Sequence, residues 1–172
     1  MNRVTLYEGQ YKRLVRENGW EFTERVHCSG VVVILPVTET GKVVLIEQYR
    51  VPVGKKVIEF PAGLASDSEV TRGESLIEAA RRELLEETGY NASQMILCTS
   101  GPASSASSSD ILTTFRAKGL VKVSEGKGDG TEMITVHEIR LQEIDRWLKT
   151  REKEGLLIDP KVYAGLYLLK SG

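Results

Sequence analysis

The chain has 172 residues, of which 41% are hydrophobic and 27% are charged, a composition typical of a single folded domain. Its 23 Lys and Arg residues nearly balance 24 Asp and Glu residues, so no basic excess indicates binding to nucleic acid. The longest apolar run, residues 30–37, is far shorter than the ~20 residues that span a bilayer, and the charged N-terminal segment does not resemble a secretory leader. Two cysteines supply no disulfide framework, so we expect a cytoplasmic protein with reduced thiols that does not bind membranes.

The first sixty residues predict short strands separated by turns. Residues 6–15 and 20–28 alternate apolar and polar side chains, and the Glu-Asn-Gly sequence at 17–19 predicts a hairpin turn between them. Residues 30–35 are almost all β-branched, as expected of a strand that is buried on both faces. Further strands are expected at residues 43–49 and 57–60, the second ending at Pro61.

A helix is predicted from near Glu74 to Gly89, which has the position of a C-terminal cap. Three more strands and two closing helices follow, and the serine-rich stretch 104–109 is expected to be a loop. Because strands and helices do not alternate regularly, this order predicts an α+β sandwich and not a doubly wound sheet. The later strands are expected at residues 95–99, 111–117 and 133–139, and the helices at 141–154 and 161–169.

The residues that suggest chemistry lie in this first helix. Glu83, Glu86 and Glu87 are spaced so that their carboxylates share one region of the helix surface within a single turn. Their mutual repulsion near the negative end of the helix dipole costs stability, which a hard divalent cation would offset. Taken alone, such a triplet is more often a solvated acidic face than a metal site.

The wider pattern resembles the signature of the Nudix hydrolase family, G-x5-E-x7-R-E-U-x-E-E-x-G-U, in which U is apolar. The chain departs from it at Ser68, where the family has glycine. Gly63 is the better match, which implies an insertion of five residues in the loop before the helix, within residues 65–72. The matching positions are Glu74, Arg82, Glu83, Leu84, Glu86, Glu87, Gly89 and Tyr90.

Further segments resemble the ADP-ribose and nucleoside-diphosphate-sugar pyrophosphatase branch of that family. They are Trp20-Glu21, the Gln-Tyr-Arg sequence at 48–50, residues 58–64 and residues 159–163. The resemblance implies a Nudix-type α/β/α sandwich with a mixed sheet. It also implies an N-terminal β arm at residues 1–28, which would pair two subunits into a homodimer, and a Nudix hydrolase domain at residues 29–172.

The same resemblance implies a set of site residues. Mg²⁺, for which Mn²⁺ can substitute, would be held by the three glutamates and by a backbone carbonyl, and a loop glutamate would activate water. Glu132 is the preferred general base, with Asp129 and Glu125 as alternatives. The metal ligands would be Ala62, Glu83, Glu86 and Glu87, of which Glu83 and Glu87 are also catalytic, and the substrate-binding residues would be Arg50, Glu59, Leu64, Trp20 and Arg25.

Plainer interpretations exist for two of these residues. Arg50 could be a surface charge at a strand end, and Trp20 could be an apolar hairpin residue instead of a stacking platform for the nucleobase. Glu59, in contrast, lies in an apolar strand, where a role in a site explains the charge better than burial does.

The expected reaction is hydrolysis of the diphosphate bond of ADP-ribose or a related nucleoside diphosphate sugar, which gives a nucleoside monophosphate and a sugar phosphate. GDP-mannose or another nucleoside diphosphate hexose is an alternative substrate. A non-catalytic ADP-ribose sensor is a second alternative, although a pure binder would not need the glutamate cluster.

Overall fold

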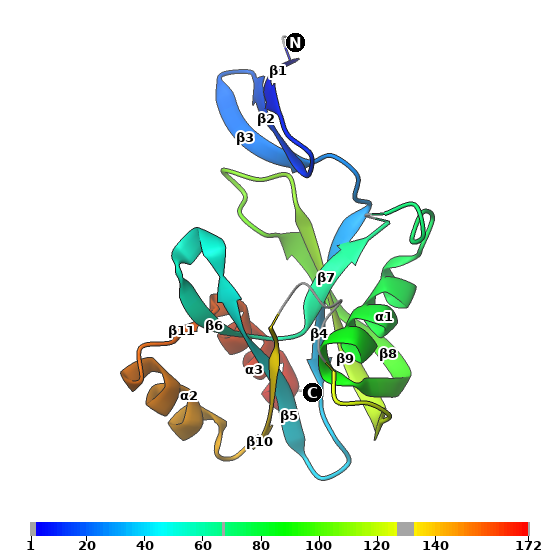
Figure 1. The fold of residues 1–172 in the computed structure, drawn as a ribbon, viewed down its shortest axis with the longest axis vertical. Coiled ribbons are helices and arrows are strands. Elements are labelled where there is room, and N and C mark those ends of the chain that lie inside the picture. The colour runs from blue at the N-terminus through cyan, green and yellow to red at the C-terminus, as the bar shows by residue number, and fades with distance from the viewer. Residues whose placement is uncertain (1–2, 67, 127–132, 172) are drawn as a thin grey trace.

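The computed structural model describes residues 3–66, 68–126 and 133–171. A small antiparallel sheet, here called the arm, stands apart at the N-terminus (Figure 1) and consists of β1 (Arg3–Glu8), β2 (Lys12–Glu17) and β3 (Trp20–Arg25). The predicted hairpin turn is present, because Asn18 and Gly19 both have positive φ, at 50° and 83°. The prediction of a single strand at residues 6–15 is wrong. A turn at Gly9, whose N–H donates to the Lys12 carbonyl at 2.9 Å, divides it into β1 and β2.

The rest of the described chain holds two four-stranded sheets, ordered β7-β4-β9-β8 and β10-β5-β6-β11. Parallel pairs, β4 with β9 and β6 with β11, occur beside antiparallel ones, so the sheets are mixed as expected. The strands are β4 (Gly30–Pro36), β5 (Lys42–Arg50), β6 (Lys55–Glu59), β7 (Ala62–Ala65), β8 (Tyr90–Pro102), β9 (Ile111–Lys122), β10 (Thr135–Arg140) and β11 (Leu157–Ile158), with a 3₁₀ turn at Val51–Val53.

The first helix, α1 (Leu76–Thr88), begins two residues later than predicted because Ser75 is its N-cap. Ser75 and Glu78 form a reciprocal capping box, and Gly89 closes the helix with φ 75°, as the sequence indicated. The two closing helices are α2 (Ile144–Lys153) and α3 (Pro160–Ser171). Among the described residues, no helix combines the length and apolar character needed to cross a membrane.

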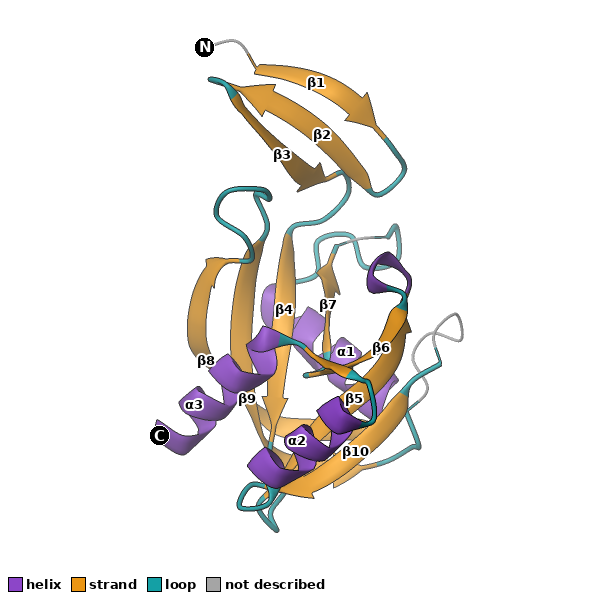
Figure 2. Ribbon diagram, turned by 90° about the vertical axis from the view of Figure 1, so that its left-hand side faces the viewer, coloured by secondary structure: helices purple, strands orange, loops and turns teal. Residues whose placement is uncertain are grey.

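Helices cover both faces of the sheets, with α1 on one side and α2 and α3 on the other (Figure 2). The β-branched run in β4 explains this layering, because its side chains point alternately to the two faces. Val32 and Ile34 pack in the core under α1, whereas Val33 and Leu35 pack in the core under α2 and α3. The predicted α+β sandwich, with helices outside and sheets between them, is therefore confirmed.

The arm makes non-covalent contact with the serine-rich loop between β8 and β9, which reaches up to β3 in Figure 1. Thr23 forms an isolated parallel bridge with Ser108. Its N–H donates to the Ser107 carbonyl at 2.9 Å, and its carbonyl accepts from the Ser109 N–H at 3.0 Å. The serine run is thus a loop, as expected, and it also provides the backbone groups on which the arm rests.

Candidate active site

A cleft of about 1010 Å³ gathers most of the residues that the sequence singled out. Its lining comes from β4, β7 and β9, from the C-terminal half of α1, and from the ends of β5 and β6 with the start of α3. Arg25 of the arm also lines it. Within the described residues, the lining carries six carboxylates and four cationic side chains.

Glu83 lies against the backbone of β7, where Gly63 leaves room for it. An added Cβ at Gly63 would stand 1.9 Å from the Glu83 carboxyl carbon, so any side chain there would occupy the place of the carboxylate. Burial raises the pKa of Glu83 to about 7, although the neighbouring Arg82 guanidinium acts in the opposite direction. Positive charge in the cleft would favour the ionised carboxylate.

Glu87 is one helical turn further along α1 and is almost completely buried, with 4% of its surface exposed. Its carboxylate accepts a hydrogen bond from the Ala62 N–H at 3.0 Å. Glu83 and Glu87 therefore meet adjacent residues of β7. This brings both carboxylates to the strand whose Ala62 carbonyl the family resemblance proposes as a metal ligand.

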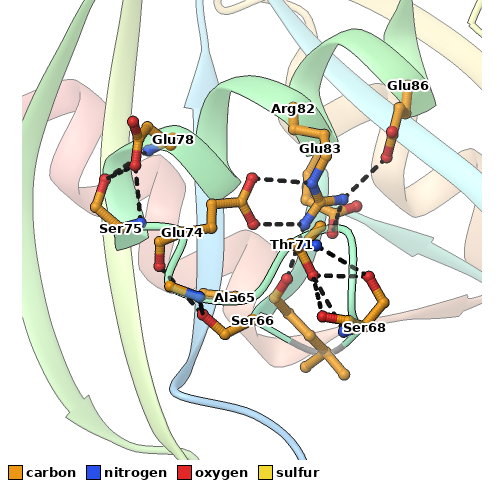
Figure 3. Close-up of polar contacts among 12 residues, drawn as sticks. Ala65, Ser66, Ser68, Thr71, Glu74, Ser75, Glu78, Arg82, Glu83 and Glu86 are labelled. Atoms are coloured by element: carbon orange, nitrogen blue, oxygen red, sulfur yellow. Dashed lines mark hydrogen bonds and ion pairs between the residues drawn. The ribbon is translucent and has the colours of Figure 1, made fainter.

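Arg82 ties the acidic residues together (Figure 3). Its guanidinium donates to both carboxylate oxygens of Glu74, at 3.0 and 3.1 Å, and to Glu83 at 2.8 Å and Glu86 at 3.0 Å. It also donates to the Leu64 carbonyl at 2.9 Å, which fixes α1 to β7. Burial opposes the charged form of Arg82, but its hydrogen bonds to Glu74 and the charge of Glu83 raise its pKa. The guanidinium is thus a permanent counter-charge in the cluster.

The donor set fits a hard divalent cation. Glu83, Glu86, Glu87 and the Ala62 carbonyl offer oxygen atoms only, the ligand type that Mg²⁺ and Mn²⁺ prefer. In the part of the chain that the structure describes, no three Asp, Glu, His or Cys side chains converge closely enough to form a metal site as they stand. Arg82 and the Ala62 N–H engage the carboxylates instead. The Glu83 carboxylate packed over Gly63 and the acidic excess of the lining nevertheless suit a cation bound beside β7.

Arg50 and Glu59 face each other in the cleft from the paired strands β5 and β6. The Arg50 Nε atom lies 2.7 Å from a Glu59 carboxylate oxygen. Burial raises the pKa of Glu59, while the charge of Arg50 works against that rise. Leu64 also lines the cleft, so the three substrate-binding candidates outside the arm all border the same space.

The two arm residues have different locations. Arg25 lines the cleft of its own chain, where its Nε atom lies 3.3 Å from Asp110 in an ion pair. Trp20 lines a separate hollow of about 420 Å³ between β3 and the serine-rich loop. Trp20 is largely exposed to solvent, with 61% of its surface accessible.

The residue proposed as general base, Glu132, lies outside the described residues, as does its alternative Asp129. The third candidate, Glu125, is described. Its side chain is 85% exposed and lies 3.9 Å from Lys122. Just after it, Gly126 packs so closely on the end of α1 that an added Cβ would come within 2.4 Å of the Thr88 carbonyl carbon. The chain thus enters the loop directly beside Glu87.

Several cleft residues were not predicted from the sequence. Asp110, Asp159 and Lys161 each line the cleft, although they lie far along the chain from the glutamate helix. The insertion was expected to form a surface loop. Its residues Ser68 and Thr71 hydrogen-bond each other (Figure 3) and line the cleft as well. The short segment at residues 159–163 had been noted only for its resemblance to the family branch, with no role in the site.

Comparison with known proteins shows the family of the chain. A family model described as the NUDIX domain matches residues 26–157. The chain belongs to the Nudix family. It is a Nudix hydrolase, and the resemblance to the ADP-ribose pyrophosphatase branch is confirmed.

Three similar proteins illustrate these relationships. The chain is 35% identical over 129 residues to the methanol dehydrogenase activator of Bacillus methanolicus, covering 74% of this chain and 67% of that protein. It is 32% identical over 130 residues to the ADP-ribose pyrophosphatase of Bacillus subtilis strain 168, covering 75% of this chain and 68% of the relative. The crystal structure of an ADP compounds hydrolase superposes with a TM-score of 0.74 at 22% identity, covering 99% of this chain and 91% of the other, which shows the shared fold.

Proposed function

We propose that the protein hydrolyses the diphosphate bond of ADP-ribose or a related nucleoside diphosphate sugar, with Mg²⁺ as its cofactor. The products would be a nucleoside monophosphate and a sugar phosphate. One observation carries the proposal: Glu83 and Glu87 both meet the backbone at residues 62–63, in a cleft that also contains Arg50. The similarity to the ADP-ribose pyrophosphatase of Bacillus subtilis supports the substrate class.

The charge of the cleft supports the need for a cation. Six carboxylates against four cationic side chains leave the described lining negative, so a diphosphate would be repelled from it. Glu83, Glu86, Glu87 and the Ala62 carbonyl would hold Mg²⁺, for which Mn²⁺ can substitute. Bound there, the ion would neutralise the diphosphate and lower the pKa of a coordinated water.

The protein's own groups would then position the reactants. Arg50 would bind a phosphate oxygen, and the Glu59 carboxylate, held at 2.7 Å from Arg50, would keep the guanidinium in place and accept hydrogen bonds from sugar hydroxyls. Water would attack one phosphorus of the diphosphate. The bond between that phosphorus and the bridging oxygen would break, and the bridging oxygen would leave with the other phosphate. Glu132 would take the proton from the attacking water.

A substrate panel tests this function. Purified protein is incubated with Mg²⁺ and either ADP-ribose or GDP-mannose, and phosphate is measured after a phosphatase is added. We expect release from ADP-ribose, with AMP and ribose 5-phosphate as the primary products. Greater phosphate release from GDP-mannose than from ADP-ribose would identify a nucleoside diphosphate hexose as the substrate. Binding of ADP-ribose without release would instead identify a sensor and overturn the enzymatic proposal.

We also propose that the arm joins two copies of the chain into a homodimer. Val15 is the only buried residue among residues 3–25, all of which are described, so the arm has almost no core of its own. It exposes Tyr7 and Tyr11 at 69% and 73%, and β1 leaves one strand edge unpaired within the described chain. Trp20 would stack on the nucleobase in the partner's pocket, and Arg25 would contact the nucleotide. Light scattering should give twice the monomer mass, and a monomer would reject the proposal.

A further inference from the structure

A second group of charged side chains lines the cleft apart from the glutamates of α1. It consists of two ion pairs, Arg50 with Glu59 and Lys161 with Asp159. Glu59 lies close enough to Asp159 and Lys161 for both charges to act on it. The proposed reaction gives a role to the first pair only, so the second pair needs an explanation of its own.

The fold holds this second pair in a fixed position. The two-residue strand β11 pairs in parallel with β6, placing Ile158 opposite Ile58, and the Asp159 N–H donates to the Ile58 carbonyl at 3.0 Å. Pro160 then begins α3, and the Asp159 carboxylate accepts from the Lys161 N–H at 2.8 Å. Residues 159–161 are therefore anchored next to the strand end that carries Glu59.

The N-terminus of α3 does not require the charged side chain of Lys161. Asp159 and Pro160 are sufficient to begin α3, whereas Lys161 lines the cleft and its ammonium contacts the Asp159 carboxylate. An ammonium has three N–H donors, so one bond to Asp159 leaves two for a ligand. The Lys161 side chain is 40% exposed, which makes these donors accessible.

The chemistry of this wall suits a sugar phosphate. Lys161 and Arg50 can bind anionic oxygens, while the carboxylates of Glu59 and Asp159 can accept hydrogen bonds from hydroxyls. The wall formed by β4 and β9 is different, because Val31 and Leu112 give it an apolar surface better suited to a nucleobase. The two ends of a nucleoside diphosphate sugar would thus meet different walls.

We propose that Lys161, held in place by Asp159, binds the sugar-phosphate half of the substrate, which separates from the nucleotide on hydrolysis. This inference rests on the proposed function and extends it by assigning the ends of the substrate to the two walls.

The test compares two products as ligands in the presence of Mg²⁺. Binding of ribose 5-phosphate and of AMP is measured by calorimetric titration for the native protein, Lys161→Met and Lys161→Arg. Loss of a charge-assisted hydrogen bond should weaken ribose 5-phosphate binding to Lys161→Met by about tenfold or more. AMP binding should change little, and Lys161→Arg should retain most of the affinity for ribose 5-phosphate.

Lys170→Met is the matched control. Lys170 lies on the same helix and pairs with Asp145 at 3.3 Å, but it does not line the cleft. Its removal should leave both affinities unchanged, and thermal melting should show that all variants are folded. Equal ribose 5-phosphate binding by Lys161→Met and the native protein, or no binding by the native protein, would overturn the inference. Weakened AMP binding alone would also overturn it, because it would place the nucleotide at this wall.

Kinetic measurements distinguish the assignment of Lys161 from the proposed hydrolase function on which it rests. For Lys161→Met we expect a higher KM for ADP-ribose with a smaller change in kcat. A native protein that hydrolyses none of the nucleoside diphosphate sugars would refute the proposed function. An active native protein whose KM is unaffected by Lys161→Met would refute only the assignment of Lys161.

Discussion

The carboxylate of Glu83 occupies the space that a side chain at residue 63 would fill, with 1.9 Å between its carboxyl carbon and the position of an added Cβ on Gly63. The glycine before the helix and the first glutamate of the acidic triplet are therefore one structural unit. The requirement for glycine here is steric, because no positive φ is recorded at Gly63.

Gly63→Ala should impair catalysis more than folding. The added methyl group must displace either the Glu83 carboxylate or β7, and a displacement of about 1 Å in an active site can cost about 10²-fold in rate. We expect a loss of that order in kcat for ADP-ribose, with the far-ultraviolet circular dichroism spectrum preserved. Gly101→Ala is the control, since an added Cβ there meets no atom within 4 Å, and it should retain native turnover. Equal kcat values for the two variants would contradict the proposed role of Glu83.

Glu87→Gln should abolish most activity while leaving the fold intact. The glutamine carbonyl can still accept the hydrogen bond from the Ala62 N–H, but the negative charge available to a metal is lost. We expect turnover to fall by several orders of magnitude in assays over a range of Mg²⁺ concentrations. Glu78→Gln removes the same charge from the other end of α1, in the capping box, and should keep near-native turnover. Near-native activity of Glu87→Gln would reject its role as a metal ligand.

The raised pKa of Tyr90 predicts that the folded protein loses stability at alkaline pH. Burial, and then its hydrogen bond of 2.6 Å to Glu138, raise the pKa of Tyr90 from 10.0 to about 12. Because the folded state holds this proton more tightly, the contribution to stability is complete below pH 10 and is lost as the pH rises toward 12. Urea unfolding midpoints should therefore fall more steeply over this interval for the native protein than for Tyr90→Phe. Parallel curves would show that Tyr90 has no such role.

Glu132→Gln tests the proposed general base. Removal of a general base should lower kcat by about 10²–10⁴-fold without changing substrate affinity to the same extent. Asp129→Asn and Glu125→Gln are measured in parallel, and Glu125 should matter least because its side chain is 85% exposed. A larger loss in Asp129→Asn than in Glu132→Gln would transfer the role to Asp129.

Sequence patterns predicted the elements whose signals are local. The β-branched run in β4 and the Gly89 cap of α1 both depend on neighbouring residues, and both are present. The short strands β7 and β11 were missed because their residues give little strand signal of their own. They are extended because they pair with β4 and β6, which are distant in sequence. The turn at Gly9 was missed although Glu8, Gly9 and Gln10 interrupt the alternation of apolar and polar side chains, because residues 6–15 were interpreted as one strand.

The candidate site divides in a similar way. The spacing of Glu83, Glu86 and Glu87 on α1 indicated a shared acidic region, and the fold brings Glu83 and Glu87 against β7. Asp110 and Lys161 could not be placed from spacing, because each reaches the cleft through the packing of sheets and helices. Arg82 is a further case. Its position in the family signature was clear, but its five hydrogen bonds to Glu74, Glu83, Glu86 and Leu64 depend on the folded geometry.

The serine-rich loop holds the arm through peptide groups of Thr23, Ser107 and Ser109. Main-chain recognition of this kind is indifferent to most side chains, so substitutions along 104–109 should be tolerated during evolution. Deletion of even one residue would shift the register against β3 and move Arg25 away from Asp110. Selection on this stretch would therefore act on its length more strongly than on its composition.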